Sequence, residues 1–189
     1  MRHPDILTRE GSVLLVSDVQ KRCIKPIYRK EPMINNLKTL VSFAGLVGLP
    51  VVLSELAPQR FGGTIEEIKK MLPRLEPIKR SRYSCFGSED LTLRLEAMNI
   101  NTLVVAGMET HVSVCQTVLD ALTRGYRVHV VYNATGARRK VDWRIGLEKM
   151  RRAGAIITTM EMVMHEMVER IDVPHFEKFQ ELVGVIAKE

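Results

Sequence analysis

The sequence predicts a three-layer α/β/α domain with a mainly parallel, Rossmann-like sheet of about six strands. Two observations predict it: strand-like apolar runs alternate with amphipathic helical segments, and the connections between them are short. Such alternation is typical of parallel strands joined by right-handed crossovers, with helices on both faces of the sheet. The 189 residues are enough for one such domain, which we assign to residues 1–189.

In the first half of the chain, the apolar run Ser12 to Ser17 predicts a buried strand that ends at Asp18. Apolar residues at helical spacing predict a helix over 32–47, which Gly48 and Pro50 end. The remaining elements expected here are a strand at 51–53, a loop at 55–63, a short helix at 64–72, a weak strand edge at 77–79 and a helix at 88–98.

In the second half, the run 103–106 predicts a buried strand that Gly107 breaks. A helix follows, with Thr110 as its N-cap because the hydroxyl can accept from a free N–H of the first turn. The elements expected after it are a strand at 127–132, a helix at 141–153, a strand at 155–158 and helices at 160–171 and 174–187.

Composition indicates a soluble globular protein, with 46% apolar and 26% charged residues. Three widely spaced cysteines indicate reduced thiols rather than a disulfide framework. No apolar run reaches membrane-spanning length and the N-terminal segment lacks a signal-peptide core, so we expect no membrane partner. We expect an intracellular location, cytoplasmic or mitochondrial.

The net charge of +6 is concentrated between Arg124 and Arg152, where nine basic residues face two acidic ones. Such a surface can attract phosphate groups. We favour a solvated helix face, because no aromatic residues interleave the charges as in single-strand binders. Nucleic-acid binding remains an alternative, through Arg138, Arg139, Lys140, Arg151 and Arg152.

The segment from Gly107 to Val112, followed by Gln116-Thr117 and Asp120-Ala121, resembles the nucleophile turn of the isochorismatase-like cysteine hydrolases, G-x-x-T-x-x-C followed by T and D-A. The family's cysteine falls on Ser113. Leu15 to Gln20 resembles the first-strand motif, in which Asp18 is the general base. The loop 54–62 resembles that of a eukaryotic isochorismatase domain-containing subgroup, and the resemblance extends over residues 12–182.

The resemblance implies a site with a carboxylate base, a lysine and a thiol at a helix N-terminus. The lysine motif K-x-x-Y/F-S places Arg80 at the lysine, with Lys79 one residue earlier. Neighbouring side chains of an extended segment point to opposite faces, so only one of the two can face the site. The residues that the resemblance implies for the substrate pocket or oxyanion site are Glu55, Met108, Glu109, Thr110 and His111.

Ser113 is the larger departure from the family. A helix N-terminus can bring a thiol's pKa of about 8.5 into the physiological range, whereas an alcohol needs a stronger base than a lone carboxylate. His111 lies about 200° round the helix from Ser113, and the same geometry turns Cys115 toward packing. Cys85, beside the lysine segment, is a further candidate thiol, although its neighbour Phe86 favours a packing role.

We expect neither a metal nor a cofactor, because the loop 54–63 contains no histidine or aspartate and the other histidines lack ligand spacing. The favoured function is a catalytically degenerate family member that acts as a binding or structural subunit. One alternative is a hydrolase of a small amide, ester or enol ether that uses Asp18 and Lys79. The other is a nucleic-acid-associated protein or nuclease that uses the 124–152 surface. We expect a small-molecule ligand and self-association or membership of a larger assembly, with the Met-rich segment 160–167 as a candidate surface.

Overall fold

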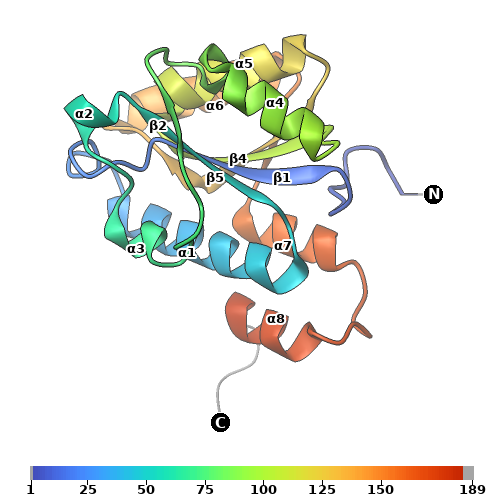
Figure 1. The fold of residues 1–189 in the computed structure, drawn as a ribbon. Helices are drawn as coiled ribbons and strands as arrows, with labels where there is room; N and C mark the ends of the chain where they lie inside the picture. Colours follow the sequence, from blue (N-terminus) through green and yellow to red (C-terminus); the bar gives the residue numbers. More distant parts are fainter. Residues whose placement is uncertain (1, 185–189) are drawn as a thin grey trace.

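The computed structural model describes residues 2–184, which form a six-stranded sheet between two layers of helices (Figure 1). All strand pairs are parallel, in the order β3-β2-β1-β4-β5-β6. The predicted three-layer α/β/α fold is therefore confirmed. The strands are β1 (Ser12–Ser17), β2 (Val51–Leu56), β3 (Ile78–Arg80), β4 (Thr102–Met108), β5 (Arg127–Gly136) and β6 (Ile156–Thr158).

The helices divide between the two faces of the sheet (Figure 1). One face is covered by α1 (Lys30–Val47), α3 (Glu66–Lys69) and α7 (Met160–Val168), and α8 (Phe176–Val183) packs on the outer side of α1 and α7. The other is covered by α4 (Glu89–Ala97), α5 (Cys115–Thr123) and α6 (Lys140–Arg152). Shorter turns complete the chain, namely α2 (Pro58–Phe61), η1 (Cys85–Gly87) and the π-helical η2 (Thr110–Val114).

Alternate residues of the buried strands supply the two cores. In β1, Leu14 and Val16 face the α1 side, whereas Val13 and Leu15 face the α5 side. All four are buried, which is why this strand is an unbroken apolar run rather than an alternating one.

The chain runs outward from β1 to β3 on one side of the sheet and from β4 to β6 on the other. The strand order therefore reverses between β1 and β4. Parallel α/β sheets place their binding crevice at such a point, beyond the carboxyl ends of the strands. Asp18 follows β1, and the η2 turn that contains Ser113 begins two residues after β4 ends.

Several elements differ from the sequence-based expectations. The helix expected at 64–72 is only the four-residue α3, and α2 was not expected at all. Strand β5 runs four residues further than expected, to Gly136, and β4 and β5 change register between Val105 and Gly107. The last helix, expected at 174–187, is α8, which begins at Phe176 and ends at Val183 with Gly184 as its C-cap, and the expected residues 185–187 lie outside the described part of the chain.

The Met-rich helix α7 mostly faces the core. Met164 and Met167 are buried, whereas Met162 is 48% exposed. Its methionines therefore offer little surface for a partner. Within residues 2–184, no helix is both long and apolar enough to cross a membrane.

Candidate active site

A crevice of about 410 Å³ opens where the strand order reverses. Asp18 and Ser113 both line it, so the structure brings together the first-strand carboxylate and the residue at the nucleophile position. The rest of its wall is mixed apolar and polar. These other residues are Gln20, Arg22, Cys23, Pro26, Leu56, Phe61, Tyr83, Met108, Glu109, Val112 and Arg138.

Backbone geometry at the ends of β1 and β4 brings the two strands close at the crevice. Asp18 has a left-handed φ of 56°, and its N–H donates to the Ser54 carbonyl at 2.9 Å. Gly107 has a φ of +112°, and a Cβ there would lie 2.1 Å from the Ser17 carbonyl oxygen. Only glycine fits this place, because both the φ and the contact exclude a side chain.

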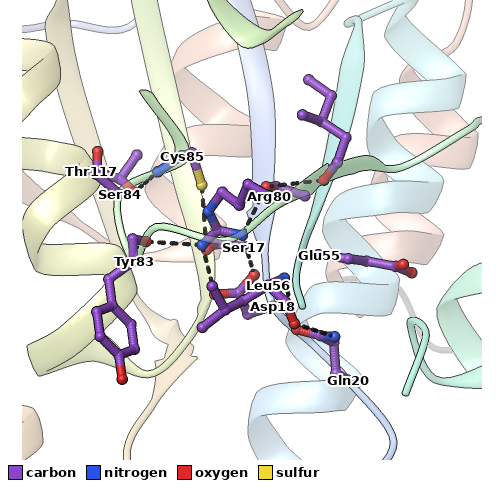
Figure 2. Close-up of polar contacts among 12 residues, drawn as sticks. Ser17, Asp18, Gln20, Glu55, Leu56, Arg80, Tyr83, Ser84, Cys85 and Thr117 are labelled. Atoms are coloured by element: carbon purple, nitrogen blue, oxygen red, sulfur yellow. Dashed lines mark hydrogen bonds and ion pairs between the residues drawn. The ribbon is translucent and has the colours of Figure 1, made fainter. Parts of the chain in front are cut away.

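A buried ion pair links Asp18, on the crevice wall, to Arg80, which is not among the lining residues (Figure 2). The Arg80 guanidinium donates from Nη1 to Asp18 Oδ1 at 2.6 Å and from Nη2 to Oδ2 at 2.7 Å. It also donates to Ser54 Oγ at 3.0 Å and to the Tyr83 carbonyl at 2.9 Å. The Arg80 side chain is 0% exposed and that of Asp18 only 8%. The fork of the guanidinium therefore holds both carboxylate oxygens, which an ammonium cannot do.

Arg80 keeps its charge despite its burial. Burial by itself lowers the pKa of the guanidinium, but the hydrogen bonds to Asp18 and the nearby Cys85 thiol outweigh it, and the pKa is raised overall. Arg80 Nε is buried and lacks a hydrogen-bond partner among the described residues. Arg80 is therefore positively charged at any physiological pH.

Lys79 lies on the other face of β3. Its side chain is exposed, whereas Ile78 and Arg80 on either side are buried. This is the alternation of an extended strand, and it directs Arg80, not Lys79, toward Asp18. Lys79 is not among the residues that line the crevice.

Ser113 lies in η2, a π-helical turn rather than the first turn of a regular α-helix. It is 3% exposed and lines the crevice. Cys115, two residues on, is buried in the core, and burial raises the pKa of its thiol. Neither Thr110 nor His111 lines the crevice. His111 packs against α6, where a Cβ on Gly146 would lie 2.9 Å from His111 Cα.

Glu55 points away from the crevice and holds the following loop (Figure 2). Its Oε1 accepts from the backbone N–H and the hydroxyl of Thr64, both at 2.7 Å. Gln20 ties the other side of that loop, donating to the carbonyls of Leu56 and Gly62 and accepting from Leu56 N–H. Glu55 therefore shapes the wall without being part of it.

Sequence reasoning missed several residues of the rim. Arg138, a member of the basic segment for which nucleic-acid binding is an alternative, lies at the crevice and donates from Nε to Glu109 at 3.0 Å. Cys23 also lines the crevice, and burial followed by the charges of Glu109 and Asp18 raises the pKa of its thiol. Its only sequence signal was its place five residues after Asp18, in the loop beyond the first strand.

No group of three or more metal-ligating side chains occurs among residues 2–184. Cys85, the other candidate thiol, is fully buried, with its Sγ 3.6 Å from Ser17 Oγ. It lies close to the Arg80 side chain (Figure 2), and it is not among the residues that line the crevice.

Comparisons with known proteins agree with this geometry. The isochorismatase domain model matches residues 12–162. The isochorismatase domain-containing protein 1 of Danio rerio is 33% identical over 97% of this chain, which spans 64% of the length of that relative. The secreted isochorismatase effector Isc1 of Phytophthora sojae is 32% identical over 94% of the chain and 86% of its own length.

Solved structures share this fold. The MAR1 ribonuclease of Caenorhabditis elegans superimposes with a TM-score of 0.85 at 30% identity, covering 97% of this chain and 94% of that one. YcaC of Escherichia coli, described as an octameric hydrolase of unknown specificity, has a TM-score of 0.88 at 23% identity, covering 96% of this chain and 92% of its own. The chain belongs to the isochorismatase family.

Proposed function

We propose that this chain is a catalytically degenerate isochorismatase-family protein that binds a small molecule in the Asp18 crevice without hydrolysing it. The observation that carries the proposal is the Arg80–Asp18 pair, with both guanidinium Nη atoms on the two carboxylate oxygens. A general base must accept a proton during the reaction. A proton on Asp18 would leave a fully buried guanidinium without its counter-ion, which costs several kcal/mol, roughly 3–5.

Ser113 supports the same conclusion. Its hydroxyl has no histidine beside it in the crevice wall, and a serine nucleophile needs such a base. The crevice itself persists, with a volume of about 410 Å³ and apolar side chains such as Leu56 and Phe61 beside polar ones. Such a cavity suits a small ligand even where the chemistry is lost.

The two alternatives have less support. The first alternative is a hydrolase that uses Lys79. It has little support because the Lys79 side chain is exposed on the face of β3 opposite to Arg80. For nucleic acid, several of the cations are already paired, because Arg138 binds Glu109 and both Arg151 and Arg152 bind Glu148. Ribonuclease is the description of the Caenorhabditis elegans relative, and we do not extend it to this chain.

Restoring the family's residues tests the proposal. We would compare Ser113→Cys with Ser113→Cys/Arg80→Lys, both in a Cys23→Ser background, because Cys23 is a half-buried thiol in the same crevice. The measurement is the rate of iodoacetamide labelling at neutral pH, with the labelled peptide identified by mass spectrometry.

We expect the Arg80→Lys change to speed labelling at position 113 by at least about tenfold, about 1.4 kcal/mol. The reason is that an ammonium can turn to the thiolate, whereas both Nη atoms of the guanidinium are held by Asp18, Ser54 and Tyr83. Equal labelling rates in the two variants would show that Arg80 does not hold the site inactive, and the proposal would fall.

A further inference from the structure

The outer surface of α6 has a groove, lined by both apolar and charged side chains, that nothing in the described chain covers. The groove is about 550 Å³ and lies between α6 and the edge of the sheet at β5 and β6. Val141 is 59% exposed, Ile145 63% and Tyr132 40%, and all three line it. Isolated exposed apolar side chains are ordinary, but three on one groove indicate an interaction surface. We call it the α6 groove.

The rim of the α6 groove is basic. Arg144, Arg151 and Arg152 line it with one acid, Glu148, which pairs with Arg151 at 3.6 Å and Arg152 at 2.7 Å. Over the whole of α6, five basic residues face two acidic ones. A partner for this groove therefore needs an apolar centre and an acidic border.

A surface with these properties is present on this chain itself. On α4, Leu93 is 62% exposed. Glu89 lies four residues before it, Asp90 three before and Glu96 three after, so all three share its side of the helix, and all are exposed. Over α4, three acidic residues accompany one basic residue, Arg94. We call Leu93 with these three acids the α4 ridge.

The ridge and the groove lie in the same helical layer but toward opposite edges of the sheet. Helix α4 joins β3 to β4, whereas α6 joins β5 to β6 at the other edge, with α5 between them in chain order. One copy can therefore use its groove and its ridge at the same time, toward two different neighbours.

We propose that the α6 groove binds the α4 ridge of a second copy of this chain. The charges select this pairing: two α6 grooves placed face to face would bring arginines against arginines, whereas groove and ridge have opposite signs. Leu93 supplies the apolar side chain that enters between Val141 and Ile145. The inference names a surface for the self-association expected from the sequence, and it does not rest on the chemistry of the crevice.

Such a contact is heterologous, because the two surfaces that meet are different. A pair of copies joined in this way still has one free groove and one free ridge, so the contact builds a closed ring or an open chain rather than a simple two-fold dimer. Added salt should weaken the assembly, because exposed charges surround the apolar centre.

The test uses two variants that each remove one half of the contact. Leu93→Lys removes the ridge and leaves the groove, whereas Ile145→Lys removes the groove and leaves the ridge. Ile171→Lys is the matched control, because Ile171 is 79% exposed and lies outside both surfaces. Mass would be measured by sedimentation velocity at about 1–100 µM, where contacts with a micromolar Kd are visible.

We expect wild type and Ile171→Lys to form assemblies, and each of the other two variants alone to be monomeric. An equimolar mixture of Leu93→Lys and Ile145→Lys should give a 1:1 dimer that grows no further, because one intact groove meets one intact ridge. This rescue cannot arise from misfolding of either variant.

Other outcomes would overturn the inference, each in its own way. A monomeric wild type would refute self-association altogether. Assemblies of Leu93→Lys alone would show that the groove binds itself or another surface. Monomeric variants that fail to combine on mixing would show that the ridge does not enter the groove. None of these results bears on the crevice, which the labelling experiment tests separately.

Discussion

The Arg80–Asp18 pair makes an asymmetric prediction for stability. Asp18→Asn leaves a guanidinium whose side chain is 0% exposed without a counter-ion, and this should lower the free energy of unfolding by about 3–5 kcal/mol. Arg80→Met leaves the Asp18 carboxylate, which lines the crevice and can be hydrated from it, so its cost should be smaller, about 2–3 kcal/mol.

The double variant completes a thermodynamic cycle. Its cost should fall short of the sum of the two single costs by about 2 kcal/mol, because each single change already breaks the same contact. The assay is urea unfolding at pH 7 followed by circular dichroism. Glu109→Gln is the control. Its partner Arg138 is 59% exposed, so removing this ion pair should lower the free energy of unfolding by no more than about 1 kcal/mol. If Asp18→Asn lowers the free energy of unfolding by no more than Glu109→Gln does, the argument that the Arg80–Asp18 pair is buried and tightly coupled is refuted.

Two further predictions concern the scaffold. His129 is fully buried with neither ring nitrogen hydrogen-bonded among the described residues, and burial lowers its pKa to about 4. The unfolded chain, with a pKa near 6.5, therefore binds more protons between these values, and stability should fall by about 2 kcal/mol from pH 7 to pH 5. His129→Leu should remove that part of the pH dependence in urea titrations, and an unchanged slope would contradict the assignment. Gly107→Ala should destabilise by about 3 kcal/mol or more, because its Cβ would meet the Ser17 carbonyl, whereas Gly125→Ala, also at positive φ but in open space, should cost about 1–2 kcal/mol by the same titration. Equal costs at the two glycines would contradict the close approach of β1 and β4.

The strands and most of the longer helices could be predicted from the sequence because local pattern determines them. The run 12–17 is apolar throughout since both faces of β1 are covered, and the structure gives the same bounds. The bounds of α4 and α6 lie within a residue of those expected. The short α2 could not be predicted, because four residues hold too little periodic signal.

The site was harder to predict from the sequence, because its geometry depends on contacts between distant segments. Strand alternation showed that only one of Lys79 and Arg80 faces the crevice, but the β2–β3 register decides which one, and it places Arg80 at Asp18. Glu55 was expected in the pocket, yet its carboxylate is bound by Thr64, nine residues later. Arg138 was grouped with a basic surface because the sequence does not show that Glu109 lies within reach of it.

The measurement that tests the central claim most directly is turnover by the unmodified protein. Wild type and Asp18→Asn would be incubated with nicotinamide, isochorismate and a panel of small amides and esters, and product would be followed by mass spectrometry. We predict no hydrolysis by wild type above that of Asp18→Asn, because Arg80 holds both oxygens of the would-be base and Ser113 has no partner to activate it. Hydrolysis by wild type that Asp18→Asn abolishes would contradict the account and establish a working hydrolase in its place.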